Sequence, residues 1–415
     1  MISPNYPLPP PIGWQCQSRL PALIPGPAIP VQTNLSLPKP DLNALLSQLS
    51  VTRRQVLPQG MGITNQPARL IPAFWRQFPT GQFNAITDVP GLKVGHVSVY
   101  RDLPSKVRTG VTAIVPDAAS LTDGQGNLAN TAFHAAAVNL NGNGELTGRG
   151  PLETAGLLNS PIILTNTYSV GAAHQGVFDY FAKHHRGQWT GQLPVIGECW
   201  DGYYNTIEDP ALSPQDTVAA LESAHSGPVQ QGRTGAGTGM RSFEMHAGIG
   251  SASRKIRLNG KEYTIGVLVN ANHSKLNNLN PLLRSALENQ FQTPLENLRQ
   301  SDNRDHANRP PLPSPRQGSI ITMIATDLPL DSKALHQLAE RAGLGIGNTG
   351  SIMATTSGDY AIAFSTANPV QVGENASPIN KSETINPDFL SPIFQATIEA
   401  VTEAQLNSIT AAHAK

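Results

Sequence analysis

A single serine stands where the chain changes character, in the stretch SPRQGSIITMIATD at residues 314–327. The residues before Gly318 are polar and include prolines, whereas an apolar run that predicts a buried strand follows it. The hydroxyl of Ser319 could attack the carbonyl carbon of Gly318, convert the peptide bond to an ester and, after hydrolysis, leave a new N-terminal serine. Its free α-amine, with a pKa of about 7.7–8.0, could then act as base for the same hydroxyl. From these residues alone, the alternative that Ser319 merely begins a strand stays open.

Such a reaction needs a small, strain-tolerant residue before the serine, which Gly318 provides, and an upstream segment that can move away. Residues 274–318 end in a polar, proline-rich stretch without a strand pattern, so we expect an exposed, mobile linker there. Ser251 in GIGSASR also follows a glycine, but the segment before it has the pattern of structured chain. We therefore reject Ser251 as the nucleophile and interpret Ser253 and Arg254 as turn residues near the site.

Other chemistries have weaker support in the sequence. There is no Walker loop, HExxH, paired CxxC or G-x-S-x-G motif, and GAGTGM at 235–240 is better explained as a tight turn than as a phosphate cradle. Five histidines lack an i,i+4 ligand partner: His96, His134, His174, His246 and His273. Cys199 has no neighbour in sequence that would lower its pKa, so we interpret it as a buried apolar residue. We expect no metal and no cofactor.

Composition limits the partners. Lys and Arg total 29, as do Asp and Glu, so electrostatics gives no reason to expect nucleic acid or an anionic membrane as a partner. No apolar run reaches the roughly 18 residues of a membrane helix, and the N-terminus lacks the pattern of a secretory signal. The two cysteines, Cys16 and Cys199, do not suggest a structural disulfide. We expect a cytoplasmic protein.

The elements that must position Ser319 follow from apolar patterning. Residues 1–82 are rich in proline, which predicts a largely disordered tail with one short helix near residues 41–55, and the globular body spans 83–415. Mixed strands and helices without regular βαβ alternation predict layered sheets covered by helices. We expect strands at 110–116, 160–167, 193–200, 264–272, 319–326 and 359–366, and helices at 216–227, 331–345 and 392–414.

Nine segments occur in an order that resembles one family. They are VPGLKVGH (89–96), VRTGVTAIVP (107–116), NGNGELTG (141–148), LTNTYSVG (164–171), GAGTGM (235–240), GIGSASR (248–254), GVLVNANH (266–273), GSIITMIATDLPL (318–330) and SGDYAIAFSTAN (357–368). Together they resemble the L-aminopeptidase/D-esterase and β-peptidyl aminopeptidase family of self-processing N-terminal-serine peptidases, related to ornithine acetyltransferases and the nylon-oligomer endohydrolase. The resemblance implies a four-layer αββα sandwich, cut into an α chain of 1–318 and a β chain of 319–415.

The resemblance also implies roles for individual residues. It places the cut between Gly318 and Ser319, with Ser319 as nucleophile, and Ser357 and Asp359 beside it as a hydrogen-bonded relay, since a spacing of two puts both on one strand face. Asn272 corresponds to a family asparagine whose amide could stabilise the oxyanion.

Residues that contact the substrate are also implied. Trp200 stands where the family has an aromatic residue, but tryptophan lacks the hydroxyl of tyrosine, so it is expected only to line the pocket. An acid should bind the substrate's amino group, and Glu145 and Glu198 are the candidates, although either could instead hold a glycine turn.

The resulting hypothesis is a serine aminopeptidase or amidase that acts on small peptides, amino-acid amides or esters and assembles as a homo-oligomer of αβ units. An acyltransferase of the ornithine-acetyltransferase type, an ω-amino-acid oligomer hydrolase and a non-catalytic relative are the alternatives. The acyltransferases typically use threonine as nucleophile, and Ser319 argues against them.

Overall fold

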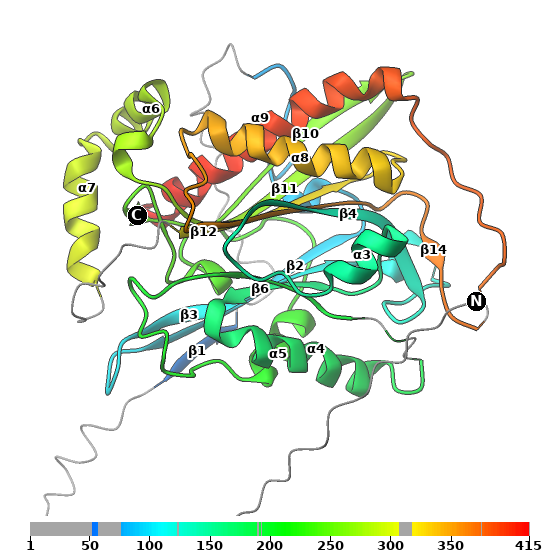
Figure 1. Ribbon diagram of the computed structural model, residues 1–415, viewed down its shortest axis with the longest axis horizontal. Helices are drawn as coiled ribbons and strands as arrows, with labels where there is room; N and C mark the ends of the chain where they lie inside the picture. Colours follow the sequence, from blue (N-terminus) through cyan, green and yellow to red (C-terminus); the bar gives the residue numbers. More distant parts are fainter. Residues whose placement is uncertain are drawn as a thin grey trace, which may run out of the picture. The chain divides into compact units, whose positions relative to one another are not determined.

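The computed structural model describes residues 52–56, 76–122, 124–188, 191, 193–306, 318–374 and 376–414. These residues form two stacked β-sheets with a pair of helices over the outer face of each (Figure 1). The first sheet has the strand order β1-β2-β3-β6-β7, and the second has the order β10-β11-β12-β13-β4-β14, with β5 paired to β4. This arrangement confirms the expected αββα sandwich.

The elements have the following bounds. The first sheet contains β1 (Arg53–Val56), β2 (Leu92–Arg101), β3 (Val107–Pro116), β6 (Ile162–Asn166) and β7 (Val195–Cys199). The second contains β4 (Thr131–Gly142), β5 (Leu157–Leu158), β10 (Gly248–Leu258), β11 (Lys261–His273), β12 (Gly318–Thr326), β13 (Gly358–Ser365) and β14 (Val370–Gln371), while β8 (Arg241–Ser242) and β9 (Met245–His246) form a separate ribbon. The helices are α2 (Ala118–Leu121), α3 (Arg149–Ala155), α4 (Val170–His184), α5 (Pro214–Glu222), α6 (Pro281–Phe291), α7 (Leu295–Asp302), α8 (Ser332–Asn348) and α9 (Leu390–Ala412), with short turns such as η4 (Gly235–Gly237) and η6 (Asn303–Asp305).

Strand β12 is buried on both faces, as its continuous apolar run predicts. Ile321 and Met323 belong to the core between the sheets, whereas Ile320 and Ile324 pack with residues of α8 and α9. Because side chains alternate along a strand, Ser319 faces the space between the sheets together with Ile321. A third core lies between the first sheet and the helices α4 and α5.

All six expected strands and all three expected helices are present, with bounds that differ by a few residues. Helix α8 begins where its sequence offers a cap, because the Asp331 side chain accepts a hydrogen bond from the Ala334 N–H at 2.8 Å. Helix α5 begins with a capping box, in which the Ser213 N–H donates to Asp216 at 2.8 Å. None of the helices in the described part of the chain is long and apolar enough to cross a bilayer.

Two parts of the expected N-terminal tail belong to the body instead. Residues Arg53–Val56 form β1, an edge strand antiparallel to β2, so the expected helix is wrong at its C-terminal end, and its remainder lies outside the described residues. Residues 76–82 also pack against the body, since the Gln77 N–H donates to Glu399 at 2.9 Å and the Pro79 carbonyl accepts from the Lys255 N–H at 2.7 Å. The sequence missed β1 because a short, charged edge strand carries no alternation of apolar residues.

The exposed, mobile linker expected at residues 274–318 is wrong for most of that range. Helices α6 and α7 occupy residues 281–302, and only 307–317 lie outside the described residues. Leu283, Leu287 and Leu295 are fully buried in a small core that includes Leu406 and Ile409 of α9. These two helices are therefore docked on the body.

Ser253 and Arg254, expected in a turn near the site, lie instead in the middle of β10. Arg254 is completely buried, and its guanidinium donates to Glu399 at 2.9 Å and to Glu403 at 2.6 Å, both on α9. This cation forms ion pairs with two buried carboxylates, so its role is to join β10 to α9.

This buried ion triad gives a stability prediction. Arg254→Ala leaves two buried carboxylates without a counter-charge, which should lower the free energy of unfolding by about 3–5 kcal/mol. Arg257→Ala on the same strand is the control, because its side chain is 72% exposed and its pair with Glu262 spans 3.9 Å, so a change within about 0.5 kcal/mol is expected. Urea unfolding of both variants checks this, and equal midpoints would contradict it.

Candidate active site

Ser319 lies at the start of β12, buried between two neighbouring strands. Asn272 of β11 is its antiparallel partner on one side and Gly358 of β13 is its parallel partner on the other. Its Oγ accepts a hydrogen bond from the backbone N–H of Trp200, at 3.2 Å, at the end of β7. The serine hydroxyl is therefore held where the two sheets face each other.

The residue before it has an unusual backbone. Gly318 has φ +107°, a conformation that L residues with a side chain rarely adopt. A Cβ at this position would lie 1.9 Å from the Asn272 carbonyl oxygen, so the close approach of the two strands also excludes a side chain. Glycine is required here on both grounds.

On the β13 side, Ser357 and Asp359 form the expected pair. The Ser357 hydroxyl donates to Asp359 Oδ1 at 2.6 Å. Asp359 is on the same strand face as Ala361, which packs on the helix side of the sheet, and its carboxylate accepts from the backbone N–H of Ile320. The pair therefore lies beside the backbone N–H of Ile320, one residue after Ser319, and not beside the inward-facing hydroxyl.

The environment of Asp359 makes its carboxylate easier to protonate than that of a free aspartate. Burial raises its pKa to about 6, and the hydrogen bonds from Ser357 and Ile320 offset only part of this effect. Its Oδ2 atom is buried and, within the described residues, has no hydrogen-bond partner. A carboxyl group with a pKa near the working pH is suited to exchanging a proton with a neighbouring nitrogen.

On the β11 side, Asn272 holds the loop that carries Trp200. Its Nδ2 donates to the Trp200 carbonyl at 2.6 Å, and its Oδ1 accepts from the Arg241 N–H at 2.8 Å. The amide that the sequence suggested for the oxyanion is thus engaged by the protein in this arrangement. The donor that reaches Ser319 is the backbone N–H of Trp200, which no side-chain pattern could reveal.

The two candidate acids lie on the other flank of Ser319. Glu198 on β7 is buried, accepts from the Glu145 N–H at 3.0 Å and pairs with the Thr167 hydroxyl. Glu198 therefore holds the turn at Gly144 and Glu145, which is the structural alternative to binding the substrate's amino group. Glu145 itself is exposed beside this turn, so its carboxylate is accessible to a ligand.

Cys199 is completely buried, as expected, and lies beside the nucleophile. Burial raises the pKa of its thiol, although a hydrogen bond with Ser319 acts in the opposite direction. The thiol packs under Ser319 as an uncharged group.

Some residues near the site were not predicted. Asn141 on β4 donates to the carbonyls of Ala354 and Ser357, and so fixes the loop before β13. The hydroxyl of Tyr360 donates to the Gly144 carbonyl at 2.9 Å, which joins β13 to the turn that carries Glu145. Asn141 is the first residue of the NGNGELTG motif, but its hydrogen bonds to the loop before β13 depend on the pairing of β4 with β13, which the sequence does not show.

The other motifs do not contribute a site. The glycine-rich segment is a tight turn, as expected, in which the Thr238 N–H donates to the Gly235 carbonyl at 3.1 Å. The Gly235 and Ala236 N–H groups donate to the side chains of Ser98 at 2.8 Å and Thr112 at 3.0 Å. Three of the histidines are buried with protein partners: His96, His246 and His273. In the described part of the chain, no three His, Cys, Asp or Glu side chains are grouped so that they could hold a metal ion.

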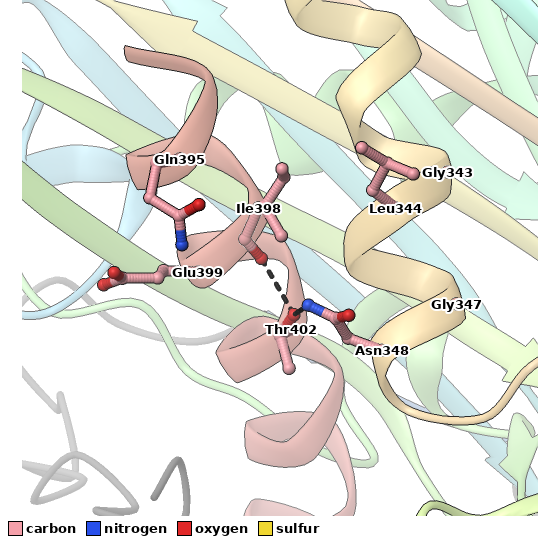
Figure 2. Close-up of a pocket in the computed structure, with 8 residues that line it drawn as sticks. All are labelled: Gly343, Leu344, Gly347, Asn348, Gln395, Ile398, Glu399 and Thr402. Carbon is pink, nitrogen blue, oxygen red and sulfur yellow. Dashed lines mark hydrogen bonds between the residues drawn. The ribbon is translucent and has the colours of Figure 1, made fainter. Parts of the chain in front are cut away.

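A groove of about 500 Å³ lies away from Ser319, between the outer helices α8 and α9 (Figure 2). Its lining residues are Gly343, Leu344, Gly347, Asn348, Gln395, Ile398, Glu399 and Thr402. None of them is a residue of the candidate site, and the groove is on the opposite side of the second sheet from the inward-facing Ser319. We therefore place the candidate site at the start of β12.

Comparison with known proteins gives consistent matches. The model of peptidase family S58 matches residues 84–415. Beta-peptidyl aminopeptidase BapA of Sphingosinicella microcystinivorans is 37% identical over 349 residues, which is 80% of this chain and 82% of the relative.

Two solved structures agree with that match. The Burkholderia sp. beta-aminopeptidase has 35% identity and a TM-score of 0.68, covering 80% of this chain and 88% of the other. The L-aminopeptidase D-Ala-esterase/amidase of Ochrobactrum anthropi, described as a prototype for the serine aminopeptidases and a variant of the Ntn hydrolase fold, has 33% identity and a TM-score of 0.69, covering 81% and 88%.

Proposed function

The chain belongs to peptidase family S58, and on this premise we propose that it cuts itself between Gly318 and Ser319 and then uses Ser319 as an N-terminal nucleophile. Its activity is that of a serine aminopeptidase/amidase, a hydrolase of peptide bonds. The observation that carries the proposal is the pairing of Gly318 at φ +107° with a buried serine whose hydroxyl is held by the Trp200 N–H.

The self-cleavage begins with attack of Ser319 Oγ on the carbonyl carbon of Gly318. The carbon–nitrogen bond breaks, the proton lost by Oγ is balanced by one gained at the Ser319 nitrogen, and an ester joins Gly318 to Oγ. We take the Asp359 carboxyl, which accepts from the N–H of the next residue, Ile320, as the group that delivers that proton. Water then hydrolyses the ester, leaving a Gly318 carboxylate and a free Ser319 amine.

Turnover uses the same atoms. The free amine takes the proton of Oγ as Oγ attacks the substrate's carbonyl carbon, and the leaving amine is protonated as an acyl-enzyme forms. The Trp200 N–H supports the Ser319 oxygen, while Ser357 and Asp359 orient the new amine. Water then releases the acyl group and restores the hydroxyl.

We propose that the substrate's amino group is bound on the flank that carries Glu145. An aminopeptidase must hold a charged amine next to the scissile bond, and Glu145 is the exposed carboxylate on this flank. Glu198 supports this position indirectly, because it fixes the backbone of the Glu145 turn. Small peptides, amino-acid amides and esters are the substrate class that this arrangement fits.

The direct test is the intact mass of the purified protein, followed by N-terminal sequencing. Two chains are expected, the smaller beginning Ser-Ile-Ile-Thr. A small chain that begins at another residue would move the nucleophile, and a single uncut chain with full activity would refute the mechanism.

Gly318→Ala should abolish or severely slow self-cleavage. A methyl group would lie 1.9 Å from the Asn272 carbonyl oxygen and would disfavour φ +107°, so the carbonyl would leave the line of attack. A gel time course of the precursor measures this.

Gly260→Ala is the matched control, because Gly260 also has a positive φ, +81°, but no atom lies within 4 Å of the position that an alanine methyl would take there. It should be cut at the wild-type rate. Equal rates for both variants would show that the Gly318 backbone has no part in cleavage.

A further inference from the structure

We propose that Arg241 binds a carboxylate on the leaving-group side of Ser319, which makes short peptides with a free C-terminus the preferred substrates. The inference rests on the proposed function, since it takes Ser319 as the nucleophile. It assigns a task to a side chain that the mechanism above does not use.

Arg241 is joined to the nucleophile by a short chain of contacts. The backbone N–H of Arg241 donates to Asn272 Oδ1 at 2.8 Å, and Asn272 is the strand partner of Ser319. Its guanidinium carbon lies 3.8 Å from the centre of the Tyr203 ring, in the loop that begins at Trp200. The stacking holds the planar guanidinium in a fixed orientation without neutralising its charge.

This guanidinium lacks an acid partner among the described residues. Its Nε atom is buried without an acceptor, and its NH2 group has only a long contact of 3.4 Å with Asn303 Oδ1, which also accepts from the Tyr203 hydroxyl. A guanidinium fork matches the two oxygens of a carboxylate, so an arginine held in this way is suited to bind one.

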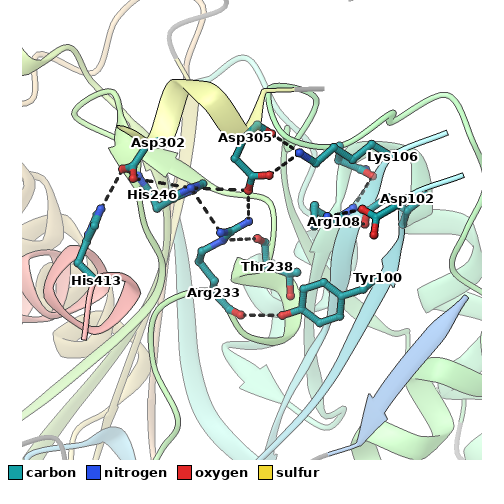
Figure 3. Close-up of polar contacts among 12 residues, drawn as sticks. Tyr100, Asp102, Lys106, Arg108, Arg233, Thr238, His246, Asp302, Asp305 and His413 are labelled. Carbon is teal, nitrogen blue, oxygen red and sulfur yellow. Dashed lines mark hydrogen bonds and ion pairs between the residues drawn. The ribbon is translucent and has the colours of Figure 1, made fainter. Parts of the chain in front are cut away.

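Neighbouring cations differ from Arg241 in this respect. Arg233 pairs with Asp305 at 2.8 Å, Lys106 pairs with the same carboxylate, and Arg108 pairs with Asp102 at 2.6 Å (Figure 3). Arg108 also lies over a tyrosine ring, that of Tyr100, at 5.8 Å. Both arginines thus lie over a tyrosine ring, Arg108 at 5.8 Å and Arg241 at 3.8 Å, but only Arg108 has a carboxylate partner among the described residues.

The strand order places opposite charges on opposite flanks of Ser319. Arg241 lies beyond β11, on one side of β12, whereas the Glu145 turn lies beyond β13, where a Cβ on Gly144 would be 3.1 Å from Gly358. A short peptide carries a positive amine at one end and a negative carboxylate at the other. Its two charges thus match the two flanks, with the scissile bond between them.

A carboxylate could reach Arg241 from two sources. One is the leaving group of the substrate, and the other is the Gly318 carboxylate that self-cleavage creates. The chemistry is the same, so the experiment must compare substrates with and without the carboxylate and also probe the new end of the α chain.

The test uses processed wild-type and Arg241→Met protein with a dipeptide, L-Ala–L-Ala or β-Ala–L-Ala, and its C-terminal amide. For the free acid, kcat/KM should fall about 10- to 100-fold in the variant, the range for losing a charge-assisted contact, and for the amide less than about threefold. Arg241→Lys should restore part of the preference. Arg108→Met is the control, and it should affect acid and amide equally, because Arg108 is already paired.

Equal losses for acid and amide in Arg241→Met would overturn recognition of the substrate carboxylate. Digestion with carboxypeptidase, followed by mass, then decides the remaining source: faster trimming of the α chain in the variant assigns the carboxylate to Gly318, and unchanged trimming overturns carboxylate binding altogether. Absence of any cut in the wild-type chain would instead refute the proposed function, so the two failures are distinguishable.

Discussion

The Ser319→Ala variant should remain one chain of 44.1 kDa and have no aminopeptidase activity. The substitution removes the only atom that can attack the Gly318 carbonyl in the proposed reaction, and it leaves no nucleophile for turnover. The fold should survive, since alanine fits a site where Ser319 is buried beside the Cys199 thiol and makes one 3.2 Å contact with the Trp200 N–H.

Two further experiments separate the loss of self-cleavage from the loss of turnover. Ser319→Cys or Ser319→Thr retains a nucleophile and should be cut, though more slowly. Co-expression of residues 1–318 with a chain that begins at Ser319 should give activity without self-cleavage, because the mature site needs only the free amine and hydroxyl. Full activity in an uncut Ser319→Ala chain would refute the nucleophile assignment and leave Ser319 as a structural residue of β12.

Asp359→Asn should lower turnover by about two to four orders of magnitude, the range for losing acid–base assistance. Asparagine keeps an acceptor for the Ser357 hydroxyl but cannot exchange a proton with the nitrogen of Ser319. Co-expressed, pre-cut chains should be used, so that slow processing is not mistaken for slow turnover.

The pH dependence adds a second readout for Asp359. In the uncut chain, burial raises its pKa to about 6, so the carboxylate that orients the amine is protonated as the pH falls through about 6. Wild-type turnover should show a second loss there, below the loss that protonation of the Ser319 amine causes at about pH 7.7–8.0. The variant should keep the loss due to the amine and lack the second one.

Asp327→Asn is the matched control for Asp359. Burial also raises the pKa of Asp327, but this carboxylate lies just beyond the far end of β12 and accepts from the Thr264 N–H at 2.6 Å. It should leave turnover and its pH profile unchanged. Near-wild-type turnover in Asp359→Asn would reduce Asp359 to a residue that shapes the start of β13.

The sequence could predict those parts of the fold where one local pattern determines the structure. The run at 319–326 contains five apolar residues, Ile320, Ile321, Met323, Ile324 and Ala325, which predict a buried strand. Leu335, Leu338 and Ala339 form the buried stripe of α8. The Ser357 and Asp359 pair was predictable because a spacing of two places side chains on one face of a strand.

The rest depended on contacts between distant segments. Helices α6 and α7 were hidden because their leucines are buried in a core built from distant segments. This core includes Phe243 and Met245 before the helices and Leu406 of α9, more than 100 residues after them. The donor to Ser319 is a backbone N–H, and every residue has one, so only the crossing of β7 and β12 selects Trp200. Arg241 directly follows the GAGTGM motif, but its stacking on the Tyr203 ring, on which the proposed carboxylate binding depends, is visible only in the fold.

The strand order of the second sheet determines what a cut at Gly318 does to the molecule. Strands β12 and β13 belong to the new small chain, yet β11 on one side and β4 on the other belong to the large one. The two chains are therefore interleaved within a single sheet, and they cannot separate without breaking the hydrogen bonds along both borders. Dilution should not dissociate the two mature chains at temperatures below their unfolding transition. Cleavage would therefore create an obligate heterodimer, in which neither chain folds without the other.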